Sequence, residues 1–320
     1  MTCIDAFKNL NIVNINNRLS ISPCCVSPTV PVDQIDFNNQ YLLDIRDTWR
    51  KGQFPLACMS CKYKKSSRMA GSNQWYVDHN FNNNDVELIR LDYWVGDICN
   101  LRCVICGPHN SSSWKYELGI TEQKQIVNKY WQTLDLTKLK FVHFNGGEPL
   151  LSKEHVEFLK DIPNKTQVQI NYNTNGTVRP SQALMDLWSE FDLVLLDFSI
   201  DDIGTRYEYQ RYPASWSEVK ENLQWFRESM PVNCMFAINT TVSILNQDTI
   251  QELDSWIEEN FSENRLGDKI EHRKQMANGI LSTDKLTGNF VKYLDQCDNR
   301  RGTDWRQVFP NLSQKFINIR

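Results

Sequence analysis

The hydrophobic and polar positions of residues 86–261 follow two alternating periods. Short apolar runs typical of buried strands occur at 87–94, 139–145, 167–173, 193–200 and 234–242. Between them apolar residues recur at helical spacing, at about 110–133, 152–160, 180–190, 215–229 and 247–261. Strands separated by crossover helices predict parallel βα units, and so an α/β sheet closed into a partial (β/α) barrel.

The first 85 residues have a different pattern. The segment "LNIVNINNRLSIS" (10–22) alternates apolar and polar residues around two asparagines, which predicts a β-hairpin. A helix is expected at 40–51. The polar stretch 78–85 is the best candidate for a linker. We therefore expect a small N-terminal hairpin and helix module over 1–85, followed by the barrel over 86–261.

The strand and helix alternation stops at about residue 262. No sixth strand is evident after that point, and the sequence predicts a C-terminal helical segment over 262–320. A barrel that lacks its sixth strand would be open on one side. Such an opening would admit a large substrate such as a peptide.

Composition and charge are those of a globular protein and do not favour a nucleic-acid-binding or membrane protein. The chain has 320 residues, a net charge of −4 and 41% hydrophobic residues, which is ordinary for a globular protein and does not favour nucleic-acid binding. No apolar run is long enough to cross a membrane. The first residues, "MTCIDAFKNL", lack the basic and apolar regions of a signal peptide, so a cytoplasmic location is expected.

Cysteine usage is the most unusual feature of the composition. There are ten cysteines, and eight of them lie in the first 106 residues. In a reducing compartment, clustered cysteines indicate metal ligands or redox groups in preference to disulfides. The segment "CNLRCVIC" (99–106) carries three of them. Four thiolates would suggest zinc or a closed iron–sulfur cluster, whereas three can hold three irons of a [4Fe–4S] cluster and leave the fourth open to a small molecule.

The CxxxCxxC spacing after the first strand of a βα series resembles the radical S-adenosylmethionine (SAM) enzymes. Three further segments match that family in order, "NGGEP" (145–149), "TNGT" (174–177) and "DFSIDD" (197–202). Each lies at the end of a predicted strand, at the sheet edge where α/β proteins place their reactive sites. Taken singly, each segment could be a plain turn or a helix cap. The resemblance spans residues 86–261.

The resemblance implies a set of ligand-binding residues. Cys99, Cys103 and Cys106 would bind a [4Fe–4S] cluster. The remaining positions would contact SAM: the GGE backbone and carboxylate at its amino group, polar side chains at its ribose and carboxylate, and an aliphatic residue in place of the usual aromatic at its adenine. These positions are, in that order, Gly146, Gly147, Glu148, Asn175, Ser199, Asp201, Arg211 and Ile105.

The resemblance also implies a reaction. An electron from a reducing partner such as flavodoxin or ferredoxin enters the cluster, and SAM is cleaved to methionine and a 5′-deoxyadenosyl radical. That radical removes a hydrogen atom from a substrate. The cofactors supply the difficult chemistry, and the protein positions the reacting groups.

A second group of cysteines precedes residue 62. Cys58 and Cys61 form a CxxC that could complete a site with Cys3 and with Cys24 or Cys25, of which we favour Cys24. The order of cysteine, hairpin, cysteine, helix and CxxC resembles the twitch module, which carries an auxiliary iron–sulfur cluster. In relatives that module follows the barrel, whereas here it would precede it. Structural zinc and a redox dithiol are the alternatives.

Two substrate classes follow from the resemblance. One is a peptide or protein, favoured by the expected opening of the barrel, and the other is a small alcohol or sugar that is dehydrogenated. A third hypothesis, of another class, is a non-catalytic protein that binds SAM or transfers electrons through its cluster.

Overall fold

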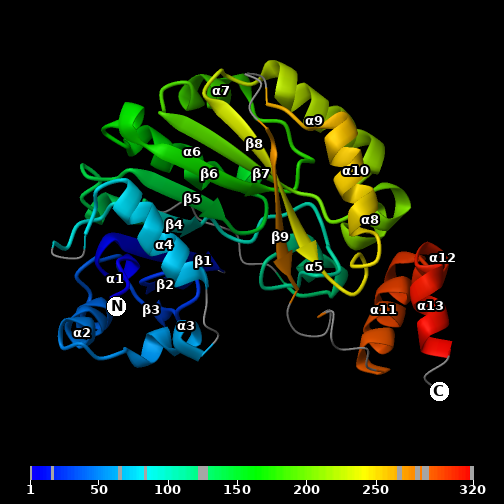
Figure 1. The fold of residues 1–320 in the computed structure, drawn as a ribbon, viewed down its shortest axis with the longest axis horizontal. Helices are drawn as coiled ribbons and strands as arrows, with labels where there is room; N and C mark the ends of the chain where they lie inside the picture. Colours follow the sequence, from blue (N-terminus) through cyan, green and yellow to red (C-terminus); the bar gives the residue numbers. More distant parts are fainter. Residues whose placement is uncertain are drawn as a thin grey trace. The chain divides into compact units, whose positions relative to one another are not determined.

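The structure is a computed structural model that describes residues 2–15, 18–63, 67–82, 85–121, 129–264, 269–277, 282 and 288–317. It divides into two compact units (Figure 1). The first unit comprises residues 1–96, 123–172 and 190–194. The second comprises residues 97–122, 173–189 and 195–320. The module boundaries expected at residues 85 and 261 stay predictions.

The first unit contains strands in the order β3-β2-β1-β4-β5-β6. The strands β1 and β2 form the predicted antiparallel hairpin, and β1 also pairs in parallel with β4, which pairs in parallel with β5, as β5 does with β6. The hairpin is therefore part of the sheet. The strands are β1 (Asn9–Ile15), β2 (Arg18–Ser22), β3 (Val30–Pro31), β4 (Arg90–Trp94), β5 (Phe141–Asn145) and β6 (Gln169–Thr174).

Helices of the first unit cover the sheet with aromatic side chains. The rings of Tyr93 on β4 and Phe158 on α6 lie 5.5 Å apart, and both side chains are buried. The helices are α1 (Asp5–Lys8), α2 (Gln40–Arg50), η1 (Leu56–Cys58), α3 (Met59–Tyr63), α4 (Ser67–Asp78), η2 (Tyr130–Thr133), η3 (Pro149–Leu151), α6 (Lys153–Asp161) and η4 (Lys165–Gln167).

The second unit contains strands in the order β7-β8-β9. Figure 1 draws α8, α9 and α10 along these strands and α11 to α13 at the C-terminal end of the chain. The elements are α5 (Ser112–Glu117), α7 (Gln182–Trp188), β7 (Leu193–Ser199), α8 (Gly204–Gln210), α9 (Trp216–Ser229), β8 (Cys234–Val242), α10 (Ile250–Asn260), β9 (Glu271–Met276), α11 (Gly288–Arg301), α12 (Trp305–Val308) and α13 (Pro310–Ile317).

Most of the predicted elements are confirmed, and their starts have a local cause. Asn39, Ser152, Ser181 and Ser215 precede α2, α6, α7 and α9, and each side chain accepts a hydrogen bond from a backbone N–H of the first turn. The helix expected over 110–133 is described only as α5 and η2, with 122–128 outside the described residues. Among the described helices, none has the length and apolar character that a bilayer crossing requires.

The expectation that no sixth strand follows residue 262 is wrong. The segment Glu271–Met276 forms β9, which runs parallel to β8 with Asn239 opposite Arg273. Its sequence, "EHRKQM", has no apolar strand pattern, because its side chains are exposed or half-buried. Pairing with β8 therefore stabilises this strand, and burial of its own side chains contributes little.

Candidate active site

The loop that carries the three cysteines, residues 99–106, lies in the second unit and is held by side chains at the start of α5. The Ser111 hydroxyl donates a hydrogen bond to the Leu101 carbonyl at 2.6 Å. The Trp114 indole N–H donates to the Cys103 carbonyl at 3.0 Å. Both donors are buried. The loop conformation is therefore fixed by a short segment that follows it directly in the sequence.

Burial opposes ionisation of the thiols of this loop, and one nearby cation favours it. Burial raises the pKa of the Cys103 and Cys106 thiols, and the guanidinium of Arg211 acts in the opposite direction on both. Metal binding deprotonates thiols outright, and a nearby cation offsets the negative charge that then accumulates. A donor set of three thiols beside one arginine fits an anionic iron–sulfur cluster.

Arg211 is paired with Asp201 inside the second unit. The two side chains are buried, and an Arg211 Nη lies 2.8 Å from an Asp201 carboxylate oxygen. The other oxygen of Asp201 accepts a hydrogen bond from the Thr241 backbone N–H at 2.8 Å. Both residues were predicted to contact SAM. Their contact with each other was not predicted. The pair brings the end of β7 and the end of α8 to the cysteine loop.

Asn175, after β6, is joined to the same loop. Its Nδ2 donates to Asn100 Oδ1 at 3.0 Å and lies 4.0 Å from the Cys99 Sγ. Asn100 in turn donates to the Thr177 hydroxyl at 2.8 Å. The segments "TNGT" and "CNLRCVIC" are therefore linked side chain to side chain. Asn100 and Thr177 were not among the predicted site residues, although both are polar residues inside the quoted motifs.

The two other predicted SAM contacts of this unit are Ser199 and Ile105. Ser199 ends β7 and is half-buried. Ile105 is also half-buried and packs against an apolar cluster that includes Val104, Tyr209 and Phe290. This cluster covers part of the Ile105 side chain. The contact of Ile105 with the adenine stays a prediction.

The GGE segment belongs to the first unit and is described there by itself. Gly146 has φ +131°, and a Cβ at this position would lie 2.5 Å from the Gly96 carbonyl oxygen. The Gly147 N–H donates to the same oxygen at 2.9 Å. Only glycine therefore fits at residue 146. Glu148 is buried and its carboxylate accepts from the Leu150 N–H at 3.1 Å, so it caps η3.

The N-terminal cysteines also come together within the first unit. Burial raises the pKa of the Cys3 thiol, and the thiols of Cys24 and Cys58 raise it further. The pKa of Cys58 is raised to about 11, again mainly by burial, with smaller contributions from Cys24 and Cys61. Cys3 and Cys58 also pack against one apolar cluster, made of Ala6, Phe7, Ile45 and Trp49. Cys24 is buried and Cys25 is exposed, in agreement with the choice of Cys24.

Two polar groups near Cys58 act to lower the pKa of its thiol, the Ser27 hydroxyl and the Trp49 indole N–H. The Ser27 hydroxyl donates a hydrogen bond to the Ala57 carbonyl at 3.3 Å, and the buried Trp49 N–H forms no hydrogen bond with the residues that the structure describes. Within the described ranges, no three histidine, cysteine, aspartate or glutamate side chains surround a point that could hold a single metal ion. Thiolates bound to different irons of a cluster lie further apart than the ligands of one ion. The donor set of four thiols is of the kind that holds a [4Fe–4S] cluster.

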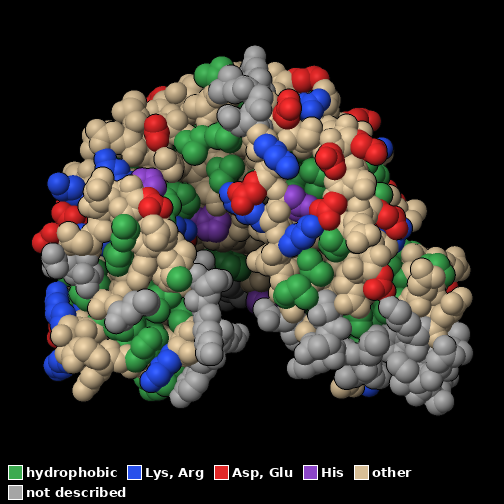
Figure 2. Space-filling view, viewed as in Figure 1, with side chains coloured by type: hydrophobic (Ala, Val, Ile, Leu, Met, Phe, Trp, Pro, Cys, Tyr) green, Lys and Arg blue, Asp and Glu red, His purple; other side chains and the backbone are tan. Residues whose placement is uncertain are grey.

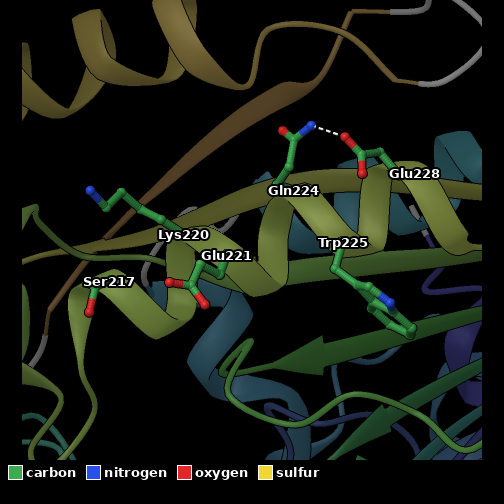
Figure 3. Close-up of a pocket in the computed structure, with 6 residues that line it drawn as sticks. All are labelled: Ser217, Lys220, Glu221, Gln224, Trp225 and Glu228. Atoms are coloured by element: carbon green, nitrogen blue, oxygen red, sulfur yellow. Dashed lines mark hydrogen bonds between the residues drawn. The ribbon is translucent and has the colours of Figure 1, made fainter.

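A shallow hollow on α9 is separate from these groups. Ser217, Lys220, Glu221, Gln224, Trp225 and Glu228 line it, and Figure 3 shows them projecting from one helix. Gln224 donates a hydrogen bond to Glu228. All six lie on a single solvent-facing helix surface, and no thiol is among them, so this hollow is not a candidate for the reaction site.

Comparison with known proteins places these features in a family. The profile of the Radical SAM superfamily matches residues 94–257, which is half of the chain. GTP 3′,8-cyclase of Petrotoga mobilis is 30% identical over 90 residues, which cover 28% of either chain. GTP 3′,8-cyclase of Alkaliphilus metalliredigens is 31% identical over 137 residues, covering 41% of this chain and 40% of the relative. The chain thus spans well under half of the length of these relatives.

Among solved structures, Streptococcus suis SuiB bound to S-adenosylmethionine is 11% identical and has a TM-score of 0.45. The likeness covers 91% of this chain and 68% of that one. The residues of the cysteine loop, "TNGT" and "DFSIDD" lie inside the matched range of the superfamily profile. On that match, the protein belongs to the Radical SAM superfamily.

Proposed function

We propose that the protein is an enzyme that reductively cleaves SAM at a [4Fe–4S] cluster held by Cys99, Cys103 and Cys106. The family uses this cluster and SAM, and when bound they supply a 5′-deoxyadenosyl radical that removes a hydrogen atom from the substrate. The observation that carries the proposal is the convergence on one loop of three thiols, the Asn175 amide and the buried Arg211. A plain structural zinc site has no use for the last two.

Each residue near the loop has a role in this proposal. Arg211 offsets the negative charge of the thiolates and presents a cation to the SAM carboxylate. Asp201 holds the guanidinium in place. The Asn175 amide, already directed at Cys99, offers hydrogen bonds to the ribose, as would Ser199 at the end of β7, with Ile105 at the adenine.

The GGE segment has a corresponding role. Gly146 and Gly147 allow the backbone to approach the methionine part of SAM closely. Glu148 would pair with the methionine amino group. Its carboxylate would then accept hydrogen bonds from both the ammonium and the Leu150 N–H. A carboxylate has room for both, because each of its oxygens accepts two hydrogen bonds.

A second [4Fe–4S] cluster at Cys3, Cys24, Cys58 and Cys61 completes the proposal. It is supported by the effect of these thiols on one another's pKa, by the packing of Cys3 and Cys58 against one apolar cluster, and by Ser27 and Trp49 near Cys58. With four ligands this cluster would have no open iron, so its role would be to conduct or accept electrons.

The substrate is the least constrained part of the proposal. The peptide or protein hypothesis rested on a barrel without its sixth strand, and β9 removes that argument. The relatives at about 30% identity are named for a reaction of GTP, so GTP is the first substrate to test. The matched segments leave most of those relatives uncovered, and a peptide and a small alcohol are the next candidates.

The test is a measurement of SAM cleavage. Protein reconstituted with iron and sulfide and reduced with dithionite should produce 5′-deoxyadenosine and methionine, and Cys103→Ala should lose both products. Cys234→Ala is the matched control, because Cys234 is buried on β8 and belongs to neither cysteine group. Unchanged SAM in the reduced parent protein would sink the proposal and favour a non-catalytic iron–sulfur protein.

A further inference from the structure

The end of α5 carries an excess of positive charge. Three arginines surround the Glu117 carboxylate: Arg301 at 3.1 Å, Arg102 at 3.4 Å and Arg300 at 3.7 Å. Among the described residues, Glu117 is the carboxylate within ion-pair distance of all three, so the group keeps a net positive charge. Arg102 and Arg300 are partly open to solvent, with side chains 22% and 31% exposed.

Exposed apolar side chains flank Glu117 in the sequence at the end of α5. Tyr116 is 84% exposed, Leu118 41% and Ile120 44%. Large apolar side chains grouped on a surface and bordered by charge are typical of protein interaction sites. We refer to these three residues together with Arg102 and Arg300 as the α5 surface.

Arg102 of the α5 surface is itself part of the cysteine loop, and the buried Arg301 makes a second connection between the two. The Arg301 guanidinium stacks over the Trp114 ring, with its Cζ 4.6 Å from the ring centroid. Trp114 then donates its indole N–H to the Cys103 carbonyl. Arg301 also donates to the Arg102 carbonyl within the loop, at 2.9 Å. Side chains in van der Waals contact and hydrogen bonds therefore connect this surface to a proposed cluster ligand, and electron tunnelling is fastest over such short, filled paths.

We propose that the α5 surface is where the electron donor docks, and that the donor is a small acidic one-electron carrier of the flavodoxin or ferredoxin kind. The inference rests on the proposed function, which requires an electron at the cluster of Cys99, Cys103 and Cys106. The carrier gives up one electron and the cluster gains it, with no bond made or broken. Opposite charge steers such encounters and the apolar patch holds them.

The charge elsewhere on the second unit also favours the α5 surface as the docking site. The chain as a whole is acidic, with a net charge of −4. On the face drawn in Figure 2 acidic side chains gather over α9 and α10, and α10 contains four acidic residues and no basic one. An acidic carrier would be repelled there. The α5 surface combines the complementary charge, the apolar area and the short path to the loop.

The experiment compares two electron sources on the reconstituted holoenzyme. Stopped-flow bleaching of the cluster absorbance is followed with reduced flavodoxin and, separately, with dithionite. Arg300→Glu and Tyr116→Glu should each slow reduction by flavodoxin about tenfold or more at low salt. Reduction by dithionite should be unchanged. Added salt should slow the parent protein towards the rate of the variants.

Lys220→Glu on α9 is the matched control, since it makes the same kind of charge reversal on a surface that Figure 1 draws well away from α5. It should leave both rates as in the parent protein. Flavodoxin-driven rates that are unaffected by both α5 variants would overturn the proposal. If Arg300→Glu also slows reduction by dithionite, the proposal is judged on Tyr116→Glu, because Tyr116 is the more exposed residue.

The outcome is distinguishable from failure of the proposed function. Dithionite-driven SAM cleavage tests that function without any docking partner. Binding of oxidised flavodoxin to the holoenzyme, measured by calorimetry at low salt, tests docking without SAM. Binding that is weakened about tenfold by Arg300→Glu supports the α5 surface, and binding that is equal in the variant and the parent protein counts against it.

Discussion

The two groups of cysteines in this protein are built in opposite ways. The loop group, Cys99, Cys103 and Cys106, occupies eight consecutive residues, and the fold brings a cation to it. The N-terminal group, Cys3, Cys24, Cys58 and Cys61, spans almost sixty residues, and the fold itself brings the thiols together.

The two groups also differ in the charges and hydrogen-bond donors that surround their thiols. Arg211 lowers the pKa of two thiols of the loop group. In the N-terminal group, the influences that lower thiol pKa values are hydrogen bonds, from the Ala6 backbone to Cys3 and from Ser27 and Trp49 to Cys58. A cation beside three thiols suits a site that also takes a charged ligand, whereas neutral donors suit a site that holds only a cluster. On the proposed function, the loop group would therefore serve the chemistry and the N-terminal group would serve electron transfer.

The largest expected effect separates the two groups by function. Cys103→Ala should abolish formation of 5′-deoxyadenosine, whereas Cys58→Ala should keep it when dithionite is the electron source. Each variant should hold about four irons fewer than the parent protein, which we expect to bind about eight. Iron analysis and product quantification check this. Loss of 5′-deoxyadenosine in Cys58→Ala despite four retained irons would show that the second group also serves SAM cleavage.

Removal of the cation tests the loop group next. Arg211→Met would leave Asp201 buried and unpaired, which costs about 3–5 kcal/mol in similar cases. Denaturant unfolding should show this loss, and Arg211→Met with Asp201→Asn should recover part of it. The exposed pair Arg50 and Asp47 is the control, because Arg50→Met should cost less than about 1 kcal/mol. An equally small cost at Arg211 would mean that the buried pair carries no charge.

A pH-dependent effect is expected in the first unit, away from both groups. Glu154 on α6 is buried against Tyr93, and burial raises its pKa from 4.5 to about 7. Because the folded state holds this proton more tightly, Glu154 makes the free energy of unfolding fall as pH rises from 4.5 to 7. Burial lowers the pKa of the adjacent His155 from 6.5 to about 4, so His155 makes that free energy rise between pH 4 and 6.5.

In the parent protein these two trends largely offset each other. Glu154→Gln removes one of them, so the free energy of unfolding should rise by about 3 kcal/mol between pH 4 and 6.5. Urea unfolding at a series of pH values measures the slope. The exposed Glu157→Gln on the same helix is the control. The same slope in Glu154→Gln as in the parent protein would contradict the assignment.

The smallest effect is expected at the N-terminal group. Trp49→Phe removes a buried N–H near Cys58, and a cluster whose thiolate ligand loses a nearby hydrogen-bond donor is harder to reduce. The midpoint potential of the second cluster should fall by roughly 20–60 mV, the equivalent of one hydrogen bond. A redox titration followed by electron paramagnetic resonance checks this. Trp75→Phe, in the same unit, should leave the potential unchanged.

The strands were predictable where their side chains are buried. The apolar runs at 139–145, 193–200 and 234–242 coincide closely with β5, β7 and β8, because buried apolar side chains recur along each strand, at alternate positions in β5 and at consecutive positions within β7 and β8. The strand β9 was not predictable in that way. Its six residues are held by a neighbour, and no apolar pattern marks them.

The candidate site was predictable to a similar extent. Cysteine spacing and the order of the motifs identified the residues, because their chemistry is local. Which side chains bind each other was not predictable, as the pairing of Arg211 with Asp201 and of Asn100 with Thr177 shows. These contacts join segments from different strand ends, so only the folded chain defines them.

The composition of β9 also bears on how this protein behaves at high concentration. It is the last strand in the order, and its outer edge pairs with no strand among the described residues. An open edge invites another chain to add a strand and begin aggregation. Glu271, Arg273 and Lys274 place charge along this edge, while β3, at the other end of the order, is two residues long and ends in Pro31. Both terminal strands thus resist the self-association that a smoother, more apolar edge would promote.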